Sequence, residues 1–339
     1  MTGGALPEQV GALLALTGQR IPVVQAPIGS AATPALVGAV TRAGGMGGLA
    51  MTWSDPAAAV AKVRATREAT GGAAFFANFV LHFPCEGFGA ALDAGVPIVT
   101  LSWGLNAGMV ARAHRAGAKV GIQVGNADGA RRAREAGADF LIAQGVEAGG
   151  HVQSTTPLAT LLPAVLAEAG GLPVIAAGGI ASGAAIARVI AAGAAGAMMG
   201  TRFLASAEAD VHADYQAALI AACSDDTAFT NCFDVGWPFA MHRVLRNDTF
   251  KAWEAAGCPQ PPARPGEGET VFRGVDEDFP RYSDTSPMPG ATGALRSACL
   301  YAGAGVGDIR SVEPAEGLTV RLWAEARAEL VRSPERGRA

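Results

Sequence analysis

One local pattern recurs eight times between residues 23 and 200, and it constrains the fold more than any other feature of the chain. A segment rich in alanine and arginine ends in Ala-Gly or Gly-Gly, and a short apolar run follows. The Ala-Gly step is typical of a helix C-terminus, where glycine takes the left-handed conformation at little cost. The apolar runs do not alternate with polar residues, as expected of parallel strands covered on both faces. The predicted strands lie at residues 23–26, 43–50, 73–80, 94–104, 116–125, 136–143, 170–179 and 192–200.

Eight helix–strand units favour an α/β protein with a closed (β/α)8 architecture, a TIM barrel, over an open doubly wound sheet. The pattern stops after Thr201. We therefore predict that residues 1–20 and 20–230 form the barrel. Residues 231–339 are predicted to form a C-terminal, partly helical and irregular extension that packs on or over the barrel mouth.

Within this second part of the chain, three segments have distinct sequences. Residues 202–232 are rich in alanine and are predicted to be helical. Residues 257–292 are rich in proline and glycine and are predicted to form an exposed excursion. Residues 314–331 are amphipathic, which predicts a helix that closes the fold.

Bulk composition excludes several classes of function. The net charge is only −4 and no basic run is present, which argues against nucleic acid as a partner. No apolar run reaches the roughly 18 residues that a membrane span requires. The N-terminus lacks the basic and apolar regions of a signal peptide, so we expect a cytoplasmic protein. The sequence leaves a homo-oligomer open.

Two glycine loops at the ends of the last two predicted strands indicate an anion-binding site. The functional face of such a barrel lies at the C-terminal ends of its strands. The seventh strand ends in Ala177-Gly178-Gly179 and the eighth in Gly200-Thr201. Backbone N–H groups in such loops, with the Thr201 hydroxyl, can hold a phosphate without any lysine. The alternative is that both loops are merely tight turns.

The sixth predicted strand ends in Glu147-Ala-Gly-Gly-His151, the strongest candidate for a catalytic element. Gly149 and Gly150 let the backbone approach a flat or charged ligand closely, because no Cβ stands in the way. His151 offers a group that titrates near neutral pH, so we predict that it is catalytic rather than structural. Glu147 is either a residue that orients the loop or a solvated carboxylate.

Uncharged amides dominate the rest of the predicted mouth. Gln25, Asn78 and Gln123 can donate and accept hydrogen bonds without net charge, as needed to read the polar edge of a flavin or a base. No other histidine lies at metal-ligand spacing around His151, so no metal site is predicted.

Taken together, these motifs resemble the nitronate monooxygenase family of FMN-dependent TIM-barrel oxidoreductases. The resemblance covers roughly residues 20–330. It rests on Gln25-Ala-Pro-Ile-Gly29, Asn78, Gln123, Gly145-Val-Glu-Ala-Gly-Gly-His151, Ala176-Ala-Gly-Gly-Ile180 and Met199-Gly-Thr-Arg-Phe203.

The resemblance implies a cofactor and a role for each matched residue. FMN would lie with its isoalloxazine beside Ala26, Ile28 and Gly29, and His151 would be a general base or would position the substrate. The remaining implied FMN contacts are Asn78 and Gln123 to the ring system and ribityl chain, Ala148, Gly149 and Gly150 against the flavin, and Ala177, Gly178, Gly179, Gly200 and Thr201 around the phosphate.

The implied reaction is the FMN-dependent oxidation of a small alkyl nitronate by O2, which yields a carbonyl compound and nitrite. Two alternatives remain open. The first is an NAD(P)H-dependent FMN reductase that acts on a quinone, enoyl or nitro substrate. The second is a flavin-free barrel enzyme that holds a phosphorylated metabolite on the same glycine loops.

Overall fold

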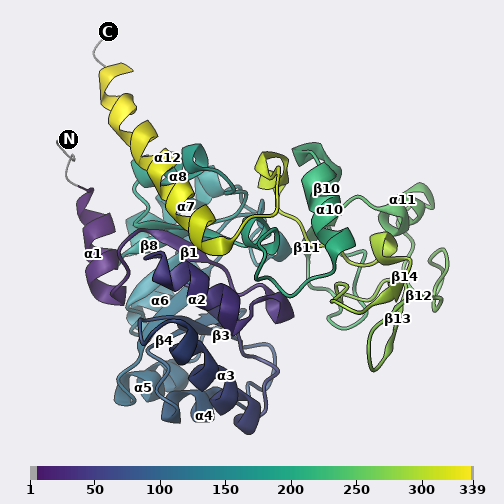
Figure 1. Cartoon of the computed structure of the whole chain (residues 1–339), viewed down its shortest axis with the longest axis horizontal. Coiled ribbons are helices and arrows are strands. Elements are labelled where there is room, and N and C mark those ends of the chain that lie inside the picture. Colours follow the sequence, from purple (N-terminus) through teal and green to yellow (C-terminus); the bar gives the residue numbers. More distant parts are fainter. Residues whose placement is uncertain (1–5, 337–339) are drawn as a thin grey trace.

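A closed barrel of eight parallel strands forms the larger part of the molecule (Figure 1). The computed structural model describes residues 6–336, so residues 1–5 and 337–339 of the predicted barrel and extension lie outside the described residues. The strand order is β1-β9-β8-β6-β5-β4-β3-β2, and a parallel bridge between Val24 and Met46 closes the ring. Each predicted strand overlaps an observed one, and the predicted fold class is confirmed. The strands are β1 (Val23–Gln25), β2 (Gly48–Ala50), β3 (Phe76–Val80), β4 (Ile98–Ser102), β5 (Lys119–Val124), β6 (Phe140–Gln144), β8 (Val174–Ala177) and β9 (Gly196–Met199).

Helices follow the strands and cover the outside of the barrel (Figure 1). The predicted Ala-Gly helix ends are present, and Gly117 and Gly137 have φ values of 80° and 93°. The helices up to the extension are α1 (Glu8–Thr17), α2 (Pro34–Arg42), α3 (Pro56–Ala69), α4 (Phe88–Asp93), α5 (Ala107–Arg115), α6 (Ala127–Glu135), α7 (Leu158–Glu168), α8 (Gly183–Ala191) and the short α9 (Thr201–Leu204), with the 3-10 turn η1 (Gly29–Ala31) after β1.

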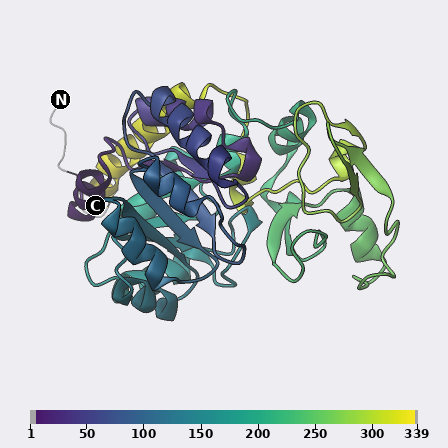
Figure 2. The ribbon, with the colours of Figure 1, turned by 90° about the horizontal axis from the view of Figure 1, so that it is seen from below.

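The last helix, α12 (Ala315–Arg336), packs against α8 and α2 and so completes the ring of helices. The segment between α9 and α12 is therefore inserted between the last barrel strand and the last barrel helix. Both ribbon views place this segment to one side of the barrel (Figures 1 and 2).

Aromatic side chains fill the barrel interior, and glycines on neighbouring strands make room for them. A Cβ at Gly48 would overlap the ring of Phe76, and one at Gly121 would overlap the ring of Phe140. These close approaches explain why two strands carry glycine, which otherwise weakens a strand. Leu13 of α1 joins the same buried cluster.

The inserted segment has two small antiparallel sheets. The first has the order β10-β11-β7 and joins β10 (Thr227–Thr230) and β11 (His242–Leu245) to β7 (Gly150–His151), which belongs to the loop after β6. The second joins β12 (Thr270–Arg273), β13 (Asp278–Pro280) and β14 (Thr292–Gly293). The remaining elements are α10 (Ala213–Ala221), α11 (Asp248–Ala255), η2 (Ser224–Asp226), η3 (Leu295–Ser297) and η4 (Ala304–Asp308).

The predicted helix over residues 202–232 is only partly correct. Helix α10 lies within it, but residues 227–230 form strand β10. The strand exists because Thr227 to Thr230 pair in antiparallel register with Leu245 to His242, a contact that the local sequence does not encode. The sheet of the inserted segment thus begins before the predicted boundary at residue 230.

Candidate active site

A cavity of about 610 Å³ opens at the C-terminal ends of the barrel strands, and the inserted segment supplies one of its sides. All but two of the residues that the sequence singles out for a site border this one cavity, the exceptions being Gln25 and Glu147. Those that border it are Ala26, Ile28, Gly29, Asn78, Gln123, Ala148, Gly149, Gly150, His151, Ala177, Gly178, Gly179, Gly200 and Thr201.

The loops after β8 and β9 form one end of the cavity. The backbone N–H groups of Gly178, Gly179 and Thr201 donate to no protein acceptor in the described part of the chain. The Thr201 hydroxyl accepts a hydrogen bond from the Gly303 N–H at 2.9 Å, so its own proton is left to donate. No lysine or arginine of the described residues lines the cavity. A ligand anion at this end would therefore meet backbone dipoles and a hydroxyl rather than a formal positive charge.

The two adjacent glycines Gly149 and Gly150 have different surroundings: Gly149 is tightly packed, and Gly150 faces open space. A Cβ at Gly149 would lie 2.5 Å from the backbone nitrogen of Gly303, so glycine is needed for packing there. Gly150 has a φ of +83° and no atom within 4 Å of a built Cβ, as does Gly29 at a φ of +56°. Both glycines line the cavity, and they leave bare backbone facing it.

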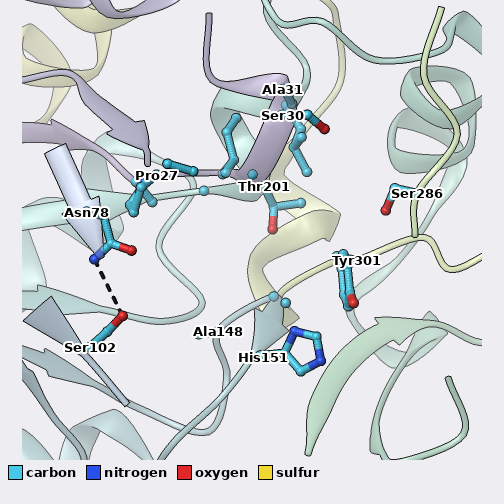
Figure 3. Close-up of a pocket in the computed structure, with 18 of the residues that line it drawn as sticks. Pro27, Ser30, Ala31, Asn78, Ser102, Ala148, His151, Thr201, Ser286 and Tyr301 are labelled. Atoms are coloured by element: carbon cyan, nitrogen blue, oxygen red, sulfur yellow. Dashed lines mark hydrogen bonds between the residues drawn. The ribbon is translucent and has the colours of Figure 1, made fainter. Parts of the chain in front are cut away.

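Asn78 lies at one wall of the cavity (Figure 3). Its amide nitrogen donates to Thr100 Oγ1 at 3.0 Å and to Ser102 Oγ at 3.4 Å. These bonds leave the Asn78 amide oxygen as the free acceptor on this wall.

A chain of glutamine amides runs from β5 to the backbone of the histidine. The amide nitrogen of Gln123 donates to the amide oxygens of Gln144 at 3.1 Å and Gln153 at 2.8 Å. The amide nitrogen of Gln144 in turn donates to the carbonyl of His151 at 3.4 Å. Gln144 also lines the cavity, although the sequence analysis did not select it.

Gln25 does not belong to the cavity, contrary to its predicted place among the mouth amides. It is fully buried at the seam of the barrel, where its oxygen accepts from Gly48 N at 3.0 Å and its nitrogen donates to Gly48 O at 3.1 Å. The side chain thus ties β1 to β2, the two strands that no continuous ladder joins.

Glu147 holds the loop rather than facing a ligand. Both of its carboxylate oxygens accept from the Leu158 N–H at 3.0 Å, at the first residue of α7. A carboxylate at this position stabilises a helix N-terminus. Of the two predicted roles, the loop-orienting one matches this contact.

His151 lies on β7, where the barrel loop pairs with the inserted segment. Its backbone is in register with that of His242 on β11. Its Nε2 atom is buried and has no hydrogen-bond partner among the described residues. Burial, and then the neighbouring His242 imidazole, lower the pKa of His151 to about 3, so the ring is neutral near pH 7.

His242 shows by contrast how a structural histidine is held. Its Nδ1 lies 3.0 Å from the carbonyl of Ala240, and its Nε2 accepts from the Phe233 N–H at 3.2 Å. The ring is completely buried and fully hydrogen-bonded. Of the two histidines, only His151 has a ring nitrogen left without a partner and borders the cavity.

Aromatic rings surround His151. Trp237 lies 4.5 Å from it between ring centroids, Tyr301 5.5 Å and Trp103 6.4 Å. Figure 3 shows the rings of His151 and Tyr301 beside each other. Trp103 has a φ of 57°, which is rare for a bulky residue and is retained chiefly at functional positions.

These aromatic residues were not predicted from the sequence as part of the site. Neither were the other cavity residues that come from the inserted segment. Trp103 directly follows β4, so its place at a strand end was a usable signal. Tyr215, Trp237, Asp284 and Tyr301 carried no such signal, because they reach the cavity from the inserted segment.

Residues 6–336 offer neither a metal-binding cluster nor a membrane-spanning helix. No group of three or more histidine, cysteine or acidic residues there could hold a metal ion. Likewise, the helices within this range are all too short or too polar to cross a bilayer.

Known proteins with a related sequence or structure include several kinds of oxidoreductase. A (3aS,4S,5R,7aS)-5-hydroxy-7a-methyl-1-oxo-octahydro-1H-indene-4-carboxyl-CoA dehydrogenase from Mycobacterium tuberculosis is 38% identical over 250 residues, which are 72% of this chain and 68% of that protein. FabK from Thermotoga maritima superposes with a TM-score of 0.79 at 26% identity, over 96% of this chain and 98% of that one. A nitroalkane oxidase from Streptomyces ansochromogenes gives 0.75 at 29% identity, over 95% and 99%.

The sequence profile of one family matches most of the chain. That family is described as nitronate monooxygenase, and its profile matches residues 88–325. The match spans the strands from β4 onward, the His151 loop, both glycine loops and the inserted segment. The predicted resemblance is therefore confirmed: this chain is an enzyme of the nitronate monooxygenase family of flavin-dependent oxidoreductases.

Proposed function

We propose that this enzyme uses FMN to oxidise alkyl nitronates with O2, yielding a carbonyl compound and nitrite. One observation carries the proposal: a single cavity joins an anion-binding end made of free backbone N–H groups to a neutral histidine without a partner. A nitronate has already lost the proton on the carbon beside its nitro group, so a base is needed to form the nitronate from a neutral nitroalkane. His151 is the group in this cavity that suits that task.

The cavity fits a flavin mononucleotide on two counts. The free N–H groups of Gly178, Gly179 and Thr201 suit a phosphate. The bare backbone at Gly29 and Gly150 leaves room for a flat ring. Bound there, FMN would supply the acceptor for the substrate's electrons and the route by which they reach O2.

His151 would act on the substrate in its neutral form. Because its pKa is lowered to about 3, the His151 imidazole is neutral, and so able to accept a proton, at any pH above that value. The glutamine chain through Gln144 fixes the backbone of His151, and the Trp237 ring covers the imidazole from solvent. These contacts hold the base in one orientation and exclude water from it.

The visible spectrum of the purified protein, followed by anaerobic mixing, tests the proposal. We expect a yellow protein whose absorbance is bleached by propyl-2-nitronate without any pyridine nucleotide. Rapid bleaching by NADH or NADPH instead would favour the reductase. A colourless protein that FMN cannot reconstitute would contradict the proposal and revive the flavin-free alternative, which family membership does not support.

A flavin-dependent dehydrogenation of a bulky acyl-CoA is a second candidate. The Mycobacterium tuberculosis relative is named as a dehydrogenase of a bicyclic acyl-CoA. In this chain the mouth carries large apolar rings, including Trp53 with 66% of its surface exposed. Bleaching by cyclohexanecarbonyl-CoA but not by the nitronate would establish this reading in place of the first.

A further inference from the structure

Among residues 6–336, Asp284 is the only acidic residue that borders the cavity, and it belongs to the inserted segment. Its backbone is fixed at both ends: its N–H donates to the Val235 carbonyl at 2.9 Å, and its carbonyl accepts from the Tyr301 hydroxyl at 2.8 Å. Its carboxyl group, however, makes no hydrogen bond or ion pair with any other described residue, and the backbone of Asp284 itself is its one partner. A partly buried carboxyl normally has such a partner.

The surroundings of this carboxyl contain no positive charge to balance it. The titratable groups that interact electrostatically with the Asp284 carboxyl are Asp234, Cys299 and Tyr301. Asp234 is itself paired with Arg264. Burial, with a further contribution from Asp234, raises the pKa of Asp284 to about 6. Above that pH the group is an unpaired anion at the edge of the cavity.

A glycine beside the Asp284 carboxyl leaves space for that group at the edge of the cavity. Gly236 also lines the cavity, and a Cβ there would overlap the Asp284 carboxyl. The next residue, Trp237, contacts His151, and Tyr301 touches both His151 and the backbone of Asp284. Asp284 and His151 therefore border the same compartment, separated by Trp237 and Tyr301.

We propose that Asp284 is a specificity-determining residue that accepts a hydrogen bond from a neutral donor on the substrate, a hydroxyl or an amide N–H remote from the reacting carbon. The same carboxylate disfavours substrates that carry a second negative charge, because no cation in the cavity offsets the repulsion. This inference rests on the proposed function for the identity of the reacting carbon. The recognition of a donor group by Asp284 does not depend on which oxidation follows.

Three probes of similar size and different charge test the inference at pH 8. They are 3-nitro-1-propanol, 3-nitropropionate and 1-nitrobutane, the last serving to normalise turnover. In Asp284→Asn the ratio of kcat/KM for 3-nitropropionate to that for 3-nitro-1-propanol should rise roughly tenfold. The matched control is Asp276→Asn, which removes the same charge from an exposed residue outside the cavity and should leave the ratio within twofold.

A binding measurement separates failure of this inference from failure of the proposed function. Butyrate and butyramide are not oxidised, and tryptophan fluorescence reports their binding because Trp103 and Trp237 line the cavity. Asp284→Asn should strengthen butyrate binding relative to butyramide by a similar factor, even if no nitro compound is turned over. An unchanged ratio in this measurement would overturn the role of Asp284, whatever the reaction proves to be.

Discussion

The two sides of the cavity differ in the chemical groups that they present. The barrel side presents glycine backbone, free N–H groups and uncharged amides, with Gly178, Gly179 and Thr201 at the proposed phosphate end, together with the rings of Trp53 and Trp103. The inserted segment presents large or ionisable side chains, among them Trp237 and Asp284. Bare backbone suits a cofactor whose shape does not change, whereas side chains can be exchanged without altering the fold. Under the proposed function, the glycine backbone of the barrel would hold the flavin, and the inserted segment would supply side chains that select the substrate.

His151 lies at the junction of these two sides, and its removal should have the largest effect. In His151→Ala the turnover of a neutral nitroalkane should fall by roughly 10²-fold or more, because the proton acceptor is lost. Turnover of the preformed nitronate should fall less, since that substrate has already lost its proton. Stopped-flow reduction of the flavin measures both, and the flavin content should be unchanged. Loss of the flavin from His151→Ala would mean that His151 also contributes to flavin binding, which would contradict a division of roles between the two sides of the cavity.

A second variant tests the barrel side alone. Gly150→Ala adds a methyl group that points into open cavity space, so flavin affinity should fall about tenfold as measured by fluorescence titration. Gly117→Ala is a matched control, because Gly117 has a φ of +80° and equally open surroundings but is exposed on the outer surface. Both variants carry similar backbone strain, about 1 kcal/mol. Equal flavin affinity in the two would refute the assignment of Gly150 to the flavin site.

A third variant tests the side of the inserted segment. In Trp237→Leu, water gains access to the imidazole, and the pKa of His151 should rise from about 3 toward its ordinary value. The kcat/KM of the variant should then fall several-fold between pH 7 and pH 5, whereas that of the wild type stays level over this range. Phe239→Leu, at a residue 90% exposed and outside the cavity, should behave like the wild type. A level profile in Trp237→Leu would show that this ring does not control the base.

The smallest expected effect is on stability. The folded-state pKa of His151 lies below its unfolded value of about 6.5, so the unfolded chain binds the proton first as the pH falls. This residue therefore costs stability below pH 6.5, by about 1 kcal/mol between pH 7.5 and pH 5.5. Urea unfolding of the flavin-free protein and of His151→Asn should show the wild type losing more stability over that interval. Parallel losses in both would indicate that the imidazole is more hydrated than its surroundings imply.

Much of the barrel was predictable because the relevant signals are local. The Ala-Gly helix ends and the apolar runs lie next to each other in the chain, Gly178 and Gly179 follow β8 directly, and His151 lies in the loop after β6. Gln25 was misplaced because the face that it presents depends on its pairing with Gly48, which is distant in the sequence. Strand β10 was missed for the same reason, since its partner is β11. Asp284 reaches the cavity through contacts with Val235 and Tyr301, which no local pattern encodes.

The short pairing of β7 with β11 has an evolutionary consequence. Because the backbone of His151 is hydrogen-bonded to the inserted segment, a substitution in that segment can tilt the reactive ring while the histidine itself is retained. New substrate preferences can thus arise through substitutions in residues 205–314 without any change to the glycine loops after β8 and β9. A scaffold arranged in this way is well suited to diversify after gene duplication.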